Sequence, residues 1–168
     1  MPTGNQRVGT KRSRKMERIK TIIKDSGAVA ILSTEQLMQK CKKMLMDEMD
    51  NDEIHWIDTD NISLDMAEKW SFPEINEDTI AFLQYTSGST SNPKGVMVSH
   101  KNLIHNEKVI SISISSNEKD VIVNWLPLYH DMGLIGNVLK AVYIGATSII
   151  MSPNDFLQKP IRWLKTIT

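Results

Sequence analysis

The sequence lacks several features that mark particular classes of protein. It has one cysteine, Cys41, in 168 residues, so no internal disulfide can form and a reducing, cytoplasmic setting is expected. No apolar run reaches the ~20 residues that a membrane-spanning helix needs, so we do not expect an integral membrane protein. The 20 basic and 20 acidic residues cancel, and this balance argues against a nucleic-acid partner.

Apolar periodicity and turn residues predict alternating helices and strands. Helices are predicted over residues 14–26, 34–49, 100–112, 132–145 and 160–168. Strands are predicted over residues 28–33, 54–57, 79–86, 96–99, 120–128 and 146–151. This order indicates an α/β fold with alternating strands and helices around a mostly parallel sheet.

Several finer features follow from residue type. Ser33 is predicted as the N-cap of helix 34–49, because Gln36 three residues later completes a capping-box pattern. Asp131 is predicted as the N-cap of helix 132–145, and we interpret the glycines of that helix as tolerated. Residues 58–78 are polar and predict a loop.

The ends of the sequence suggest an incomplete domain. Residues 1–13 are polar and are expected to be irregular, so the domain is predicted to occupy residues 14–168. The last predicted helix reaches Thr168 without a C-cap glycine. We therefore expect the chain to be a fragment of a longer protein.

One segment, QYTSGSTSNPKGVMVSH, stands out between two predicted strands. Seven of the ten residues from Thr86 to Gly95 are Ser, Thr or Gly, and Lys94 adds one positive charge. Hydroxyl and backbone N–H donors on such a loop can surround an anion, phosphate above all. No Asp or Glu occurs from Thr79 to Asn106, which fits an anion-binding role.

Two other interpretations of this segment are weaker. A Walker-type loop requires G-K-[ST], but Pro93 precedes Lys94 and Gly95 follows it. A flexible Ser/Gly linker is the remaining alternative, and linkers are seldom framed by two apolar strands. The segment is therefore predicted to be a phosphate-binding loop of another kind.

The stretch YTSGSTSNPKGVMVSH resembles the signature of adenylate-forming enzymes, which comprise acyl-CoA synthetases, nonribosomal peptide adenylation domains and luciferases. Two later stretches, LPLYHDMGLIG and MSPNDFLQKPIRWL, resemble the fatty-acyl-AMP ligase branch. Ser91 is a departure, because most members have Gly there. The resemblance covers about residues 14–168.

The resemblance implies a partial acyl-adenylate synthetase N-terminal domain. Its parent enzyme would use ATP and Mg²⁺ to convert a fatty acid to an acyl adenylate. The acyl group would then pass to an acyl carrier protein or to a polyketide or nonribosomal peptide synthase module. The residues implied to bind ATP are Thr86, Ser87, Gly88, Ser89, Thr90, Ser91, Lys94 and Gly95.

The resemblance also implies individual roles. Thr86 would be the protein ligand of Mg²⁺, and Lys94 and His130 would be the catalytic residues, with His130 positioning the acyl carboxylate. A His130–Asp131 dyad is disfavoured, because adjacent residues do not readily face each other. A metal site at His130 is also disfavoured, because no second His or Cys lies nearby at the spacing of metal ligands.

Alternatives remain open at this point. The parent enzyme could be a long-chain acyl-CoA synthetase, which uses coenzyme A as acceptor, or the chain could be a non-catalytic, truncated nucleotide-binding remnant. The family's small C-terminal domain with its catalytic lysine, its Thr-Glu magnesium motif and its ribose-binding aspartate are absent from these 168 residues. The chain alone is therefore expected to be weak or inactive.

Overall fold

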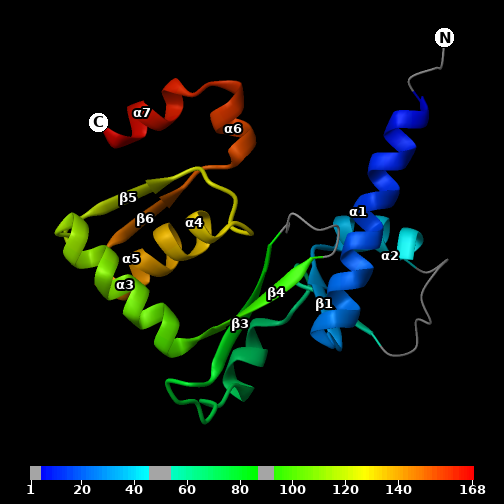
Figure 1. Cartoon of the computed structure of the whole chain (residues 1–168), viewed down its shortest axis with the longest axis horizontal. Coiled ribbons are helices and arrows are strands. Elements are labelled where there is room, and N and C mark those ends of the chain that lie inside the picture. The colour runs from blue at the N-terminus through cyan, green and yellow to red at the C-terminus, as the bar shows by residue number, and fades with distance from the viewer. Residues whose placement is uncertain (1–4, 46–53, 87–92) are drawn as a thin grey trace. The chain divides into compact units, whose positions relative to one another are not determined.

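The computed structural model describes residues 5–45, 54–86 and 93–168, which belong to two units (Figure 1). The first unit comprises Met1–Glu74 and Leu83–Val96, and the second comprises Ile75–Phe82 and Met97–Thr168. Each unit is described by itself below. Both combine helices with strands, so the predicted α/β class is confirmed.

The first unit contains a β-α-β arrangement. Its elements are α1 (Asn5–Ser26), β1 (Ala30–Ser33), α2 (Glu35–Leu45), β2 (His55–Asp58) and η2 (Leu64–Lys69). Strands β1 and β2 pair in parallel, with Ala30 opposite His55 and Ser33 opposite Asp58. A parallel pair needs a crossover connection, and α2 lies within it and packs against β2. Gly27 ends α1 in the left-handed conformation, with φ of 61°.

Two predictions for this unit differ from the structure, and part of a third is not tested. Helix α1 begins at Asn5 rather than residue 14, because the Lys, Arg and Gln residues there have good helix propensity. Residues 64–69 form the short 3₁₀ helix η2 inside the predicted loop, and the Ser63 side chain caps it by accepting from the Asp65 N–H. Predicted helix residues 46–49 lie outside the described residues.

The predicted N-cap at Ser33 is wrong. Ser33 is the last residue of β1, where its backbone carbonyl accepts from the N–H of Thr59 at 2.9 Å. The first N–H of α2, that of Glu35, instead donates to the carboxylate of Asp60 at 3.0 Å. Strand pairing therefore overrides the local capping pattern, and a distant carboxylate does the capping.

A hairpin of β3 (Ile80–Thr86) and β4 (Lys94–Ser99) frames the Ser/Gly segment. The strands run in opposite directions, because Thr79 accepts from the N–H of His100 at one end while Tyr85 lies against Gly95 at the other. Residues 87–92 lie outside the described part of the chain. Both predicted strands are confirmed, and β4 begins two residues earlier than expected.

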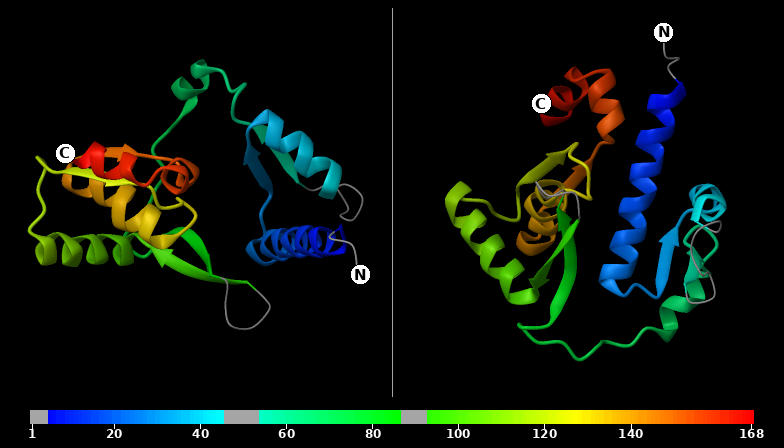
Figure 2. Two further views of the ribbon diagram at one scale, coloured as in Figure 1. Left: turned by 90° about the horizontal axis from the view of Figure 1, so that it is seen from above. Right: turned by 45° about the vertical axis from the view of Figure 1, so that its right-hand side comes forward.

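The second unit contains another β-α-β arrangement. Its elements are α3 (His100–Ile114), β5 (Val121–Asn124), α4 (Asp131–Gly133), η3 (Leu134–Leu139), α5 (Lys140–Ile144), β6 (Thr147–Ile150), α6 (Pro153–Gln158) and α7 (Ile161–Ile167). Strands β5 and β6 pair in parallel, with Val121 opposite Thr147. Helix α3 lies beside η3 and α5, and α7 packs against β5 (Figure 2).

The predicted helix 132–145 is present as α4, η3 and α5 in succession. Its middle, Leu134–Leu139, is π-helical, which is rare and is often found at functional sites. The predicted last helix, residues 160–168, is confirmed as α7, whereas α6, which Ser152 caps one residue before Pro153, was not predicted. A proline suits the first turn of a helix, so this local signal was present in the sequence.

An aromatic cluster joins α6 and α7 to the β5–β6 pair. The Phe156 ring stacks on Trp125 with 3.8 Å between centroids, and Trp163 meets Phe156 edge to face. The Trp163 indole N–H donates to the carbonyl of Val123 at 2.9 Å. The backbone carbonyls of Asp120 and Asn124 accept hydrogen bonds from residues at the ends of β6. Successive carbonyls of a strand point to opposite edges, so the Val123 carbonyl, and with it Trp163, lies at the other edge of β5.

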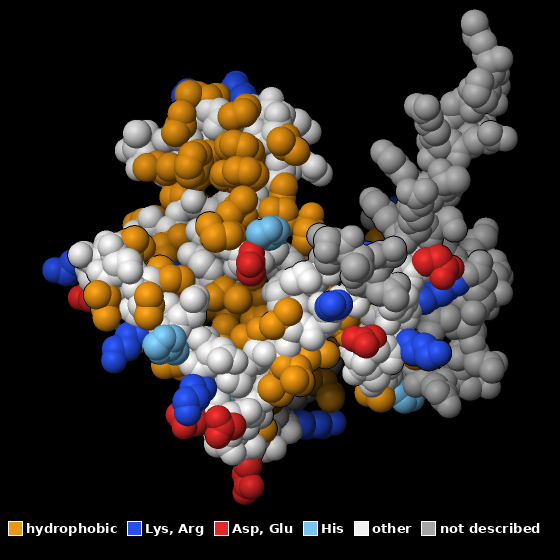
Figure 3. Space-filling model, in the orientation of Figure 1, with side chains coloured by type: hydrophobic (Ala, Val, Ile, Leu, Met, Phe, Trp, Pro, Cys, Tyr) orange, Lys and Arg blue, Asp and Glu red, His pale blue; other side chains and the backbone are white. Residues whose placement is uncertain are grey.

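Few apolar side chains of the described residues are fully buried. Ile23 and Ala141 are the buried hydrophobic residues there, whereas many large apolar residues stay exposed. Figure 3 shows hydrophobic side chains gathered over α6 and α7, where the exposed residues are Leu157, Ile161, Leu164 and Ile167. No helix among the described residues is long and apolar enough to cross a lipid bilayer.

Candidate functional site

The first group of predicted site residues lies at the open end of the β3–β4 hairpin. Thr86 ends β3 and Lys94 begins β4, and both side chains are exposed. The structure thus presents a hydroxyl and an ammonium group at the two ends of the Ser/Gly segment. The predicted residues Ser87, Gly88, Ser89, Thr90 and Ser91 lie outside the described residues.

Gly95, the last residue of the predicted loop, is required by its close approach to Tyr85. A Cβ atom on Gly95 would lie 2.8 Å from Cζ of Tyr85 and 3.0 Å from its hydroxyl oxygen. Any larger residue would therefore displace the tyrosine ring. Gly95 contributes space for a neighbouring ring, which the sequence did not reveal.

Tyr85 is tied to α1 through its hydroxyl group. The Tyr85 hydroxyl donates to Oδ2 of Asp25 at 2.6 Å, across 60 residues of sequence. This hydrogen bond is the main cause that raises the pKa of the Tyr85 phenol above its usual value. Sequence analysis missed both residues, because nothing in the local pattern links positions so far apart.

His130, the second predicted catalytic residue, occupies the start of α4. Its Nδ1 accepts from the N–H of Met132 at 3.3 Å, so His130 is the N-cap and the predicted Asp131 cap is wrong. Asp131 is the first residue of the helix, although its Oδ1 also accepts from the Met132 N–H at 2.7 Å. The backbone turns into the helix one residue earlier than predicted.

His130 and Asp131 also contact each other, against the sequence-based expectation. Nδ1 of His130 lies 2.6 Å from Oδ1 of Asp131, and both side chains are largely exposed. The N-cap residue is extended and the next is helical, so adjacent side chains can converge at a helix start. Nε2 is the ring nitrogen that this contact leaves available to a substrate.

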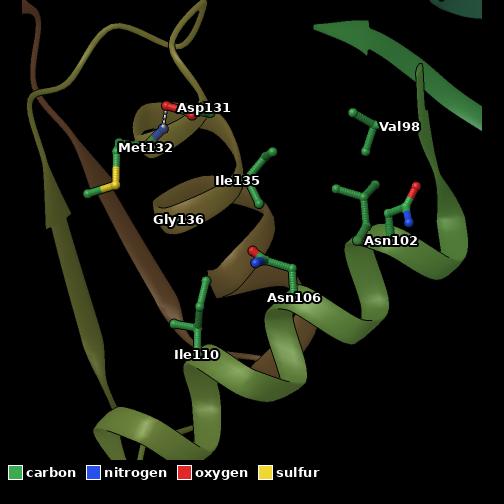
Figure 4. Close-up of a pocket in the computed structure, with 9 residues that line it drawn as sticks. Val98, Asn102, Asn106, Ile110, Asp131, Met132, Ile135 and Gly136 are labelled. Carbon is green, nitrogen blue, oxygen red and sulfur yellow. Dashed lines mark hydrogen bonds between the residues drawn. The ribbon is translucent and has the colours of Figure 1, made fainter. Parts of the chain in front are cut away.

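A cavity of about 440 Å³ begins at the same helix start (Figure 4). Helix α3 forms one wall, and the turn from Asp131 to Gly136 forms the other. Its lining residues are Val98, Asn102, Leu103, Asn106, Ile110, Asp131, Met132, Ile135 and Gly136. Most of the lining is apolar, with two asparagines on α3 and one carboxylate at the α4 end.

The cavity residues were only partly accessible to sequence analysis. The segment from Asp131 to Gly136 lies within the quoted motif, but its contribution to a cavity was not predicted. The residues from α3 were missed, because their spacing matches that of any helix packed on a core. The volume lies within the ~300–1,000 Å³ typical of small-molecule sites.

Two charged residues are buried where α3 meets α5. Glu107 on α3 and Lys140 on α5 expose 2% and 1% of their surfaces. The Lys140 ammonium donates to the Ser111 hydroxyl and to the Glu107 backbone carbonyl, whereas neither carboxylate oxygen of Glu107 has a hydrogen-bond partner. Burial raises the pKa of the Glu107 carboxyl, and the positive charge of Lys140 partly offsets that rise.

Comparison with known proteins agrees with this description. The sequence model of the AMP-binding enzyme family matches residues 8–168. JamA of Moorena producens, a medium-chain-fatty-acid–acyl-carrier-protein ligase, is 39% identical over 156 residues, or 92% of this chain and 26% of that protein. TtuA of Teredinibacter turnerae, a ligase of the same name, is 48% identical over 102 residues, or 61% of this chain and 16% of that protein.

Solved structures give the same result. A fatty acyl-adenylate ligase from L. pneumophila, in complex with acyl adenylate and pyrophosphate, has a TM-score of 0.80 and 41% sequence identity. The match covers 91% of this chain and 26% of that chain. The present chain thus spans about a quarter of the length of JamA and of this ligase. The chain belongs to the AMP-binding enzyme family, and its resemblance to the fatty-acyl-AMP ligases of that family is confirmed.

Proposed function

We propose that the protein containing this chain activates a fatty acid with ATP and passes the acyl group to an acyl carrier protein. A carboxylate oxygen of the fatty acid would form a bond to the α-phosphorus of ATP, and pyrophosphate would leave. Family membership and the two acyl-carrier-protein ligases among the relatives support this proposal. The use of ATP favours a cytoplasmic location.

The observation that carries the proposal is the apolar cavity that begins beside His130. An alkyl chain needs an apolar lining, and α3 and the Asp131–Gly136 turn provide one. The acid's carboxylate would then lie near the helix start, where Nε2 of His130 is available. We assign His130 the role of positioning that carboxylate.

The hairpin would hold the phosphates of ATP. Thr86 and Lys94 are exposed at its open end, and their donors suit phosphate oxygens. We propose that Ser87, Gly88, Ser89, Thr90, Ser91 and Gly95 supply further hydroxyl and backbone donors. Mg²⁺ would bridge phosphate oxygens with Thr86 as its protein ligand, since this ion keeps several waters and takes few protein groups.

ATP–pyrophosphate exchange tests the proposal. The complete open reading frame that contains this chain should catalyse fatty-acid-dependent exchange, and the 168-residue chain alone should be weak or inactive. Transfer of labelled fatty acid to an acyl carrier protein, compared with coenzyme A, would identify the acceptor. Absence of exchange from the complete protein over a range of acyl chain lengths would refute the proposal.

Two variants test its two parts. Lys94→Ala should lower exchange by about tenfold or more, because one charge-assisted contact to the departing pyrophosphate is lost. Gly136→Leu should reduce activity more with long than with short acids, because the new side chain enters a cavity where a Cβ on Gly136 meets nothing within 4 Å. Equal losses of activity at every acyl chain length would show that this cavity does not bind the acyl chain.

A further inference from the structure

In the first unit, the Tyr85 side chain contacts both Asp25 on α1 and Gly95 on β4, so it links residues on the two sides of the Ser/Gly segment. Asp25 lies near the end of α1 and accepts the hydrogen bond from the hydroxyl of Tyr85 on β3 at 2.6 Å. A bond from a hydroxyl to a carboxylate at this distance belongs to the short, charge-assisted class. It fixes the far end of the tyrosine side chain against a helix.

The same ring also fixes the paired strand. Its Cζ, hydroxyl oxygen and Cε1 lie 2.8, 3.0 and 3.2 Å from the position of a Cβ on Gly95. The phenol end of Tyr85 therefore crosses β4 where β4 has no side chain. A residue with a Cβ there would push the hydroxyl away from Asp25, so the hydrogen bond and the glycine depend on each other.

The two residues that this ring holds are the neighbours of Thr86 and Lys94. Tyr85 directly precedes Thr86, and Gly95 directly follows Lys94. Movement of the tyrosine ring would therefore be transmitted to both through one peptide bond each. Neither Asp25 nor Tyr85 needs to touch a ligand to affect how those two donors are spaced.

We propose that Asp25 and Tyr85 are positioning residues, which hold Thr86 and Lys94 at the spacing that the phosphates of ATP require. This inference rests on the proposed function of the hairpin. A free carboxylate at Asp25 would be unfavourable near a phosphate site, because the two negative charges repel each other. Its hydrogen bond to Tyr85 engages one carboxylate oxygen, and a phenol, with an ordinary pKa of about 10, is a donor at neutral pH.

The test uses the complete open reading frame with four single variants and one double variant. Asp25→Ala removes the acceptor, Tyr85→Phe removes the donor, and Asp25→Asn keeps a neutral acceptor. The matched control is Glu77→Gln, which weakens another exposed long-range contact, the 3.1 Å ion pair between Glu77 and Lys101. The Asp25→Ala/Tyr85→Phe double variant completes a mutant cycle.

Two readouts are measured for each variant. In ATP–pyrophosphate exchange, Asp25→Ala and Tyr85→Phe should each raise KM for ATP about fivefold, as the loss of one hydrogen bond allows. KM for the fatty acid should not change, the double variant should be no worse than either single variant, and Asp25→Asn should recover part of the loss. In limited trypsin digestion, the bond after Lys94 should be cut faster in the two single variants than in wild type and Glu77→Gln.

The outcomes separate this inference from the proposed function. If wild-type protein shows no exchange, the proposed function fails, and the cleavage rate after Lys94 alone decides whether Asp25 and Tyr85 hold the ends of the hairpin. Unchanged cleavage and unchanged KM for ATP would overturn the inference. Faster cleavage with unchanged KM for ATP would also overturn the inference. Equal changes in kcat and in both KM values would overturn it too, since a general loss of folded protein would explain them.

Discussion

At the scale of single residues, the buried charges of Glu107 and Lys140 stand out. The carboxylate of Glu107 has no hydrogen-bond partner, and burial raises its pKa. The folded protein therefore retains this proton at pH values where the unfolded chain has lost it. Stability associated with Glu107 is fully present below its unfolded pKa of about 4.3 and is lost as pH rises through the higher folded value.

We predict that Glu107→Gln stabilises the chain at pH 8 by about 1 kcal/mol, because it removes the cost of ionising a buried carboxyl. The advantage over wild type should shrink toward pH 4. Thermal unfolding of both proteins between pH 4 and pH 8, followed by circular dichroism, measures this difference in stability. Glu118→Gln, at an exposed position of the same unit, serves as the control. A difference that does not vary with pH would contradict the prediction.

Sequence analysis identified the proposed site residues more easily than the residues that contact them. Thr86 and Lys94 were predicted from one short motif and His130 from a second. Their neighbours Asp25 and Tyr85 were not, because the hydrogen bond between them depends on how α1 and β3 pack. The helix start at His130 was misassigned by one residue, since Asp and His both cap helices and only the backbone decides between them.

At the scale of elements, Gly133 allows α4 to pack closely against the backbone of Leu126 and Pro127, which follow β5. A Cβ on Gly133 would lie 2.8 Å from the carbonyl carbon of Pro127 and 3.0 Å from the carbonyl oxygen of Leu126. Both are backbone atoms and cannot rotate away. The interpretation of this glycine as merely tolerated is therefore wrong, whereas it holds for Gly136, where a Cβ meets nothing within 4 Å.

We predict that Gly133→Ala destabilises the protein by about 2 kcal/mol, as overpacking typically does. Gly136→Ala, three residues later in the same helical run, should change stability by less than about 1 kcal/mol. Thermal or denaturant unfolding of the two variants side by side provides the measurement. Equal stabilities would mean that the chain near Pro127 moves freely enough to absorb a methyl group.

The order of elements was predictable, and their ends were not. Strands β1, β2, β5 and β6 carry short apolar runs, which periodicity identifies. The parallel pairing of β1 with β2 was anticipated only as a general property of the fold. Helix α6 was missed although Ser152 and Pro153 carry a local signal for a helix start, whereas the π-helical turn in η3 depends on packing that no single residue indicates.

At the scale of the whole molecule, exposed apolar surface is the main feature. Trp70, Phe72 and Leu157 expose 68%, 74% and 70% of their surfaces, and few described apolar residues are buried. Large exposed apolar patches mark surfaces that normally meet other protein or ligand. The chain also spans about a quarter of the length of JamA and of the L. pneumophila ligase.

We predict that the 168-residue chain binds a hydrophobic dye such as 8-anilinonaphthalene-1-sulfonate strongly while retaining its secondary structure. The complete open reading frame should bind less dye per mole if the remaining sequence covers these surfaces. Dye fluorescence and far-ultraviolet circular dichroism, recorded on the same samples, test this. Weak dye binding by a folded 168-residue chain would show that its apolar residues are covered in solution.

The four tryptophans are shared equally between the two units, and this gives the protein a built-in optical reporter. Trp56 and Trp70 belong to the first unit, and Trp125 and Trp163 to the second. The second pair is held by Phe156 and by the Val123 carbonyl. Replacing either pair with phenylalanine leaves emission from one unit alone. The melting of each half can then be followed separately, without an added label.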